Sequence, residues 1–132
     1  NSPKTIDEVD VFSMQDNFTA PVDPTPTMTF TTWGLRSFDI QYWDGANWVN
    51  IPGASIVNNT LVWRRFTFTP VTTTAIRVLV NAALNGSSRV IELEAWGTTA
   101  FGPAPAPVAT PIAASMLPGR SYLRTTRRAP GH

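Results

Sequence analysis

The clearest structural signal in this chain is the sequence SFDIQYWDGANWVNI at residues 37–51. Alternate positions from Phe38 to Tyr42 are apolar, which is typical of a strand that buries one face. Asp44-Gly45 follows, and an Asp-Gly pair between such segments is a strong hairpin signal. The sequence therefore predicts a β-hairpin with strands at residues 37–43 and 48–51.

Working outward from this hairpin, four more segments have strand patterns separated by turns. Residues 5–12 place Val9 and Val11 on one face and Glu8 and Asp10 on the other. The other three segments lie at 61–69, 75–81 and 89–96. Because no segment has a convincing helical period, we expect an all-β fold, an antiparallel β-sandwich or barrel.

Composition supports one compact domain followed by a tail. The chain has 132 residues, of which 42% are hydrophobic and 14% charged, which is typical of a globular protein. We place the sandwich body at residues 1–97 and a Pro/Ala-rich linker with an Arg-rich tail at 98–132. The alternating prolines of residues 102–107 exclude helix and favour an extended conformation.

Charge and composition exclude several kinds of partner and site. Four of the ten basic residues lie in the tail, so residues 1–97 carry six basic and nine acidic residues and are a poor nucleic-acid binder. The four tail arginines indicate a solvated end, or alternatively a contact with an acidic partner. The chain has no cysteine, which excludes disulfides, and no apolar run long enough for a membrane span.

The antiparallel order predicts where the loops lie. If successive strands reverse direction, the loops at 13–33, 52–60 and 82–88 share one end of the body. Rigid scaffolds usually present their binding residues on such loops. We therefore expect a binding site at this end.

Three segments together resemble one known family. They are residues 38–45 followed by Trp48 and Ile51, Phe66-Thr67-Phe68 followed by residues 76–78, and residues 89–97. In this order they resemble the discoidin, or coagulation-factor C-type, domains, which are galactose-binding-like and include the family 32 carbohydrate-binding modules. The resemblance implies a jelly-roll sandwich that binds carbohydrate without catalysis, in a modular secreted or cell-surface bacterial protein.

The chain departs from this family at its N-terminus. Family members begin with strands that carry an early Asp-Gly turn and a Trp, and this sequence starts after that region. We therefore expect an incomplete sandwich that lacks the usual first third. In the family this third supplies ligand contacts and much of a structural calcium site.

The resemblance also implies candidate ligand-binding residues on two loops. The family's contacts after the first strand correspond to Gln15, Asp16 and Asn17, although Asx turns would also explain the last two. Phe18 and Trp33 are candidate aromatic platforms, or core residues. On the last loop the candidates are Asn85, Ser87, Ser88 and Arg89, where a simple turn is the alternative. Planar polar groups beside an aromatic ring suit sugar hydroxyls and the apolar sugar face.

The resemblance makes Glu92 a candidate calcium ligand. Calcium needs six to eight oxygen ligands from several segments, and the early loop is missing. We therefore expect no cofactor, calcium included.

The sequence offers little for catalysis. Its one histidine is His132, and Glu92 and Glu94 lie on one strand face, too close in sequence to bracket a substrate. We expect a binding protein and not an enzyme, with carbohydrate as partner.

Two other functions stay open. The first is a structural or adhesive element that self-associates, its incomplete face covered by a neighbouring chain or by the tail at residues 108–117. The second is binding of protein or anionic lipid, which apolar loop tips would support. Light scattering separates the first of these from a carbohydrate-binding module.

Overall fold

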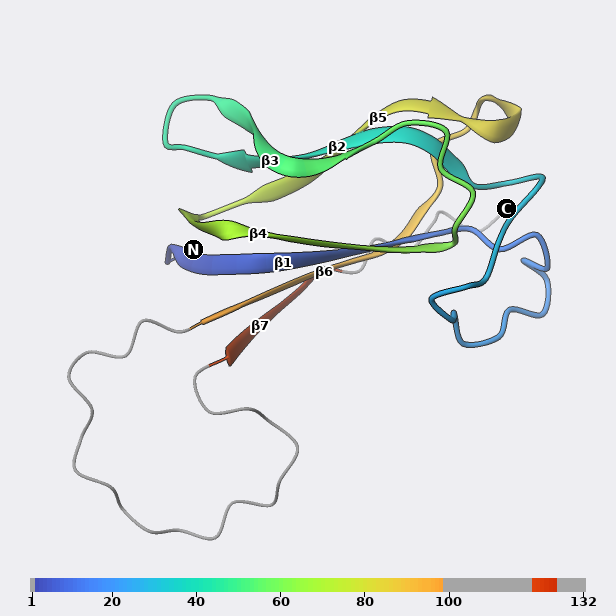
Figure 1. Cartoon of the computed structure of the whole chain (residues 1–132), viewed down its shortest axis with the longest axis horizontal. Coiled ribbons are helices and arrows are strands. Elements are labelled where there is room, and N and C mark those ends of the chain that lie inside the picture. The colour runs from blue at the N-terminus through green and yellow to red at the C-terminus, as the bar shows by residue number, and fades with distance from the viewer. Residues whose placement is uncertain (1, 99–119, 126–132) are drawn as a thin grey trace, which may run out of the picture.

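The computed structural model describes residues 2–98 and 120–125 of the chain. Figure 1 shows them as strands in two layers with one short 3-10 turn, η1 (Leu84–Gly86). The strands are β1 (Lys4–Ser13), β2 (Leu35–Trp43), β3 (Trp48–Ile56), β4 (Trp63–Thr73), β5 (Ile76–Ala83), β6 (Val90–Thr98) and β7 (Arg120–Thr125).

The strands form two antiparallel sheets, ordered β4-β1-β6-β7 and β3-β2-β5. The expected all-β, antiparallel architecture is confirmed, and each of the predicted strands is present. The predicted hairpin is β2–β3, in which Trp43 pairs with Trp48 across the Asp44-Gly45 turn. Asp44 stabilises this turn because its Oδ1 accepts hydrogen bonds from the amides of Ala46 and Asn47.

The core lies between the two sheets, which gives the molecule the layered form of a β-sandwich. Val9 and Val11 from β1 and Ile40 from β2 are almost completely buried, as the alternating pattern predicts. Phe38 and Phe66 meet edge to face across the layers, with ring centroids 5.9 Å apart. Burying each such ring contributes roughly 1.5–3 kcal/mol.

The predicted grouping of loops at one end is confirmed by hydrogen bonds between them. The amide of Phe30 donates to the carbonyl of Thr60 (3.0 Å), and the amide of Leu84 donates to that of Gly34 (3.1 Å). Buried Asn59 adds bonds from its Nδ2 to the carbonyl of Leu35 (2.9 Å) and its own loop. We call this end, formed by residues 14–34, 57–62 and 84–89, the loop end.

The tail contributes one strand that the sequence did not indicate. β7 pairs antiparallel with the outer edge of β6, with Trp96 opposite Tyr122 and Glu94 opposite Arg124. The segment at 108–117, expected to cover an exposed face, lies outside the described residues, and the division at residue 97 stays a prediction. Within residues 2–98 and 120–125, no helix has the length and apolar character needed to cross a membrane.

Candidate functional site

Asp16 anchors the long loop between β1 and β2. Its Oδ2 accepts hydrogen bonds from the amide (2.7 Å) and hydroxyl (2.8 Å) of Thr31, and its Oδ1 from the amides of Thr32 (2.8 Å) and Trp33 (3.3 Å). Desolvation raises the pKa of Asp16, but these hydrogen bonds outweigh it and hold the pKa below the usual 3.8. Both carboxylate oxygens are thereby used to hold residues 31–33 in place.

The structure brings three of the predicted residues into one cluster. The Phe18 ring meets the Trp33 ring edge to face at 5.6 Å, and the Arg89 guanidinium lies 4.7 Å above Trp33. Arg89 also donates weakly to the carbonyl of Ser87 (3.5 Å). Phe18, Trp33 and Arg89 thus join the first loop to the last, as expected if both loops serve one site.

The amide side chains at this end mainly shape the loops. Asn17 Nδ2 donates to the carbonyl of Ala20 (2.8 Å), and Asn85 Nδ2 donates to the carbonyl of Thr32 (2.7 Å). Asn85 has a φ of 54°, a left-handed conformation that asparagine tolerates. These contacts agree with the turn role that the sequence left open for both residues.

Gln15, Ser87 and Ser88 complete the predicted set. Gln15 exchanges two hydrogen bonds with the backbone of Val22, which folds residues 15–22 into a compact loop. Ser87 is half-buried beside Arg89, and Ser88 is exposed. The structure therefore places all the predicted ligand-binding residues at the loop end.

Beside this cluster lies a pocket of about 320 Å³, which we call the loop-end pocket. It is bounded by the loop after β1 and by the start of β6. Phe18, Val22 and Ile91 line it and are 50%, 61% and 40% exposed, which is high for large apolar side chains. Its full lining is Phe12, Ser13, Met14, Gln15, Phe18, Pro21, Val22, Asp23, Pro24, Ile91 and Glu92.

Ser13 supplies an unusual polar group in this lining. The residue is only 4% exposed, and its hydroxyl is buried without a hydrogen-bond partner. A buried hydroxyl left unsatisfied costs roughly 1–3 kcal/mol, so most buried polar groups are paired. Because the oxygen has almost no exposed surface, a ligand in the pocket relieves this cost only when the lining moves to admit it.

Ser13, Val22, Asp23 and Ile91 are not among the binding residues that the sequence predicts. The signal available was the sequence Pro21-Val22-Asp23-Pro24, where prolines hold an apolar residue and a carboxylate in an extended loop. Ile91 gave no signal, because one apolar residue in a strand normally packs inside.

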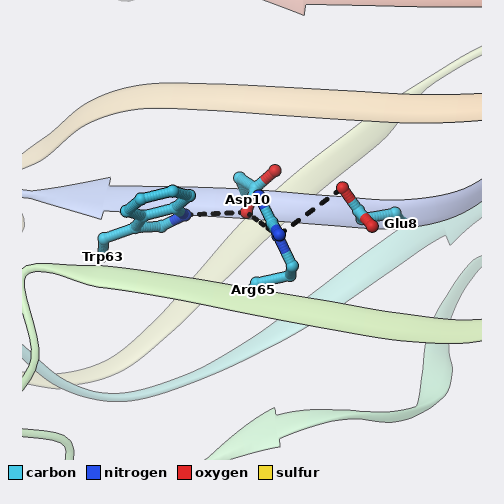
Figure 2. A network of polar contacts seen from close by, with 4 residues as sticks. All are labelled: Glu8, Asp10, Trp63 and Arg65. Atoms are coloured by element: carbon cyan, nitrogen blue, oxygen red, sulfur yellow. Dashed lines mark hydrogen bonds and ion pairs between the residues drawn. The ribbon is translucent and has the colours of Figure 1, made fainter. Parts of the chain in front are cut away.

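A second polar cluster lies on the outer face of the first sheet (Figure 2). The carboxylate of Asp10, 1% exposed, accepts hydrogen bonds from Trp63 Nε1 (2.7 Å) and Arg65 Nε (3.1 Å). Arg65 Nε also lies 3.6 Å from Glu8 Oε1. The hydrogen bond to Asp10 is the main cause that raises the pKa of Arg65. These contacts join β1 to β4 and give the cluster a structural role.

The residues around Glu92 do not fit a calcium site. Glu92 pairs with Phe12 in the sheet and lines the loop-end pocket together with Asp23. Across residues 2–98 and 120–125, no three His, Cys, Asp or Glu side chains gather in a way that could hold a metal ion. Two carboxylates fall short of the six to eight oxygens that calcium requires.

Comparisons with known proteins leave the family resemblance as a prediction. No family model, no curated protein and no solved structure matches this chain. Function therefore has to be inferred from the loop end itself.

Proposed function

We propose that this chain is a non-catalytic carbohydrate-binding domain with a galactose-binding-like jelly-roll fold, and that the loop-end pocket is its sugar site. The observation that carries the proposal is the pocket's lining, which combines an exposed aromatic ring, an unpaired buried hydroxyl and two carboxylates. We further propose a secreted or cell-surface location for it.

The lining of the loop-end pocket complements both the apolar face of a sugar ring and its hydroxyl groups. The apolar face of a sugar packs on an aromatic ring such as Phe18, while its hydroxyls donate to carboxylates such as Asp23. A sugar hydroxyl that displaces the lining enough to reach the Ser13 hydroxyl gives it the partner that the protein does not. Contacts of these two kinds together fix the orientation of a ligand.

The volume of the loop-end pocket and the charge of its lining restrict the class of ligand that it can bind. A volume of about 320 Å³ is near the lower end of ligand pockets, roughly 300–1,000 Å³, and suits a single sugar ring. The described residues that line the pocket include Asp23 and Glu92 and no basic residue. A neutral sugar is therefore favoured over an acidic one.

A glycan-array screen followed by calorimetry with the best neutral ligand tests the proposal. Phe18→Ala should weaken binding about tenfold, because it removes most of a buried apolar contact. Val57→Ala removes an apolar side chain that is even more exposed (72%) and lies outside the pocket, so it should leave the affinity unchanged.

Ser13→Ala gives a sharper test, because affinity and stability should move in different directions. Removing an unsatisfied buried hydroxyl leaves stability unchanged or raises it, whereas losing a hydrogen bond to the sugar weakens binding. Absence of any glycan ligand, or equal affinity in the Phe18 and Val57 variants, would refute the proposal.

A further inference from the structure

The outer face of the second sheet presents an arginine that its neighbours hold in one position. The Arg77 guanidinium lies 4.5 Å above the Trp48 ring, and its Nε donates to Gln41 Oε1 (2.7 Å). Gln41, only 8% exposed, is fixed in turn because its Nε2 donates to Asn50 Oδ1 (2.6 Å). Three strands, β2, β3 and β5, thus combine to orient one exposed guanidinium.

This arginine differs from the other stacked arginine on a sheet face. Arg65 stacks on Trp63 as well, but Asp10 and Glu8 offset its charge. Among residues 2–97, no carboxylate lies within ion-pairing distance of Arg77. Its charge is therefore uncompensated by the described side chains.

The two acidic side chains of the β2–β3 hairpin have other partners. Asp39 on β2 accepts hydrogen bonds from Ser55 and from Asn81 (2.8 Å), and these lower its pKa. Asp44 accepts from the amides of Asn47 and Ala46, which lower its pKa as well. Both carboxylates are held in place by neutral donors, and among the described residues neither forms an ion pair with Arg77.

An aromatic surface adjoins the guanidinium. Trp43 and Trp48 meet at 5.5 Å with their rings inclined by 64°, and both are partly exposed. An indole face packs well on the apolar face of a sugar ring, and a fixed guanidinium fork binds a carboxylate through two parallel hydrogen bonds. The two features lie side by side on the outer face of this sheet.

We propose that Arg77, Trp48 and Trp43 form a second binding site, specific for a sugar that carries a carboxylate, such as a hexuronic acid. Arg77 binds the carboxylate through its two Nη groups, and the sugar ring packs against the parts of Trp48 and Trp43 that the guanidinium leaves exposed. The site is separate from the loop-end pocket, whose acidic lining favours neutral sugars. The proposal for this second site does not depend on the function proposed for the loop-end pocket.

Calorimetric or NMR titration of the full chain with glucuronate, glucose and acetate tests this site. Glucuronate should bind at least about tenfold more tightly than glucose, because hydrogen bonds to a charged group are the stronger ones. It should also bind more tightly than acetate, which has no ring to pack on the indoles. Equal binding of glucuronate and acetate, or no binding of glucuronate, overturns the proposal.

Substitutions of Arg77 distinguish the planar hydrogen-bonding geometry of its guanidinium from its positive charge. Arg77→Gln should weaken glucuronate binding about tenfold, and Arg77→Lys should give an intermediate affinity, because lysine keeps the charge and loses the planar fork. Lys4→Gln, which removes an exposed charge from β1 in the other sheet, should bind as the parent chain does. An Arg77→Lys variant with the parent's affinity, or a Lys4→Gln loss equal to that of Arg77→Gln, shows a net-charge effect only and overturns the site.

A cross-test distinguishes the two sites. Phe18→Ala should leave glucuronate binding unchanged, and Arg77→Gln should leave neutral-sugar binding unchanged. If Phe18→Ala abolishes glucuronate binding, the carboxylate sugar occupies the loop end and the second site is wrong.

Discussion

At the residue scale, one carboxylate joins the two halves of the loop between β1 and β2. Asp16 lies just after β1, and its four donors come from residues 31–33, immediately before β2. The loop therefore closes on itself and carries Trp33 to the cluster with Phe18 and Arg89. This gives Asp16 a positioning role at the site.

Because hydrogen bonds lower the pKa of Asp16 below 3.8, the folded protein should lose this stabilisation in acid. The contribution is fully present above the unfolded value of 3.8 and is lost as pH falls through the lower folded pKa. Asp16→Asn places an amide against the Thr31 donors, so it should lower the melting temperature at pH 7. The difference from the parent chain should shrink toward pH 3.

The matched control for this pH series is Asp23→Asn, which changes an exposed carboxylate on the same loop. Its melting temperature should follow the parent's at each pH. A constant gap between Asp16→Asn and the parent from pH 7 to pH 3 would contradict the role of the ionised carboxylate.

The sequence could place Asp16, Phe18, Trp33 and Arg89 at one end, because strand order alone predicts which loops are neighbours. It could not show that Asp16 has its donors within the protein, since those partners lie 15–17 residues away. Nor could it show that Ser13 lacks a partner, which depends on the packing of the loop over it.

At the element scale, the alternation of apolar and polar residues predicts where the strands lie. Where each strand ends depends on its hydrogen-bonded pairing with neighbouring strands. The sequence predicts a strand at 48–51 only, and the Pro52-Gly53 pair that follows is of a kind that normally ends a strand. In the structure Gly53 takes a φ of 81° and the pairing shifts register, then resumes at Ser55 opposite Asp39. A bulge thus continues the strand through a turn signal.

β7 was not predicted, because residues 120–125 have no period that separates them from a solvated basic tail. Their strand conformation comes from the open edge of β6, which is a tertiary effect. Removing residues 99–132 should therefore lower the melting temperature and promote association as concentration rises, measured by light scattering.

A chain that ends at residue 125 keeps β7 and is the matched control. It should have the same melting temperature as the full chain and the same association state. If the chain that ends at residue 98 is also monomeric and has the melting temperature of the full chain, β7 does not stabilise or protect the edge of β6.

At the scale of the whole molecule, the two sheets act as a rigid support for surfaces of different character. The loop end gathers apolar, hydroxyl and carboxylate groups around a pocket, whereas the outer face of β3-β2-β5 presents an uncompensated arginine beside two indoles. The turn at residues 44–47 lies at the end opposite the pocket, where it joins β2 to β3 (Figure 1). A ligand in the pocket should therefore leave this turn undisturbed.

The central claim is that the loop-end pocket binds a neutral sugar. Amide chemical-shift mapping during titration of the full chain with a panel of neutral monosaccharides tests it most directly. We predict saturable shifts at Ser13, Phe18, Val22 and Ile91 for at least one sugar, with residues 44–47 unchanged. Shifts confined to other surfaces, or no saturable shift with any sugar of the panel, would contradict the claim.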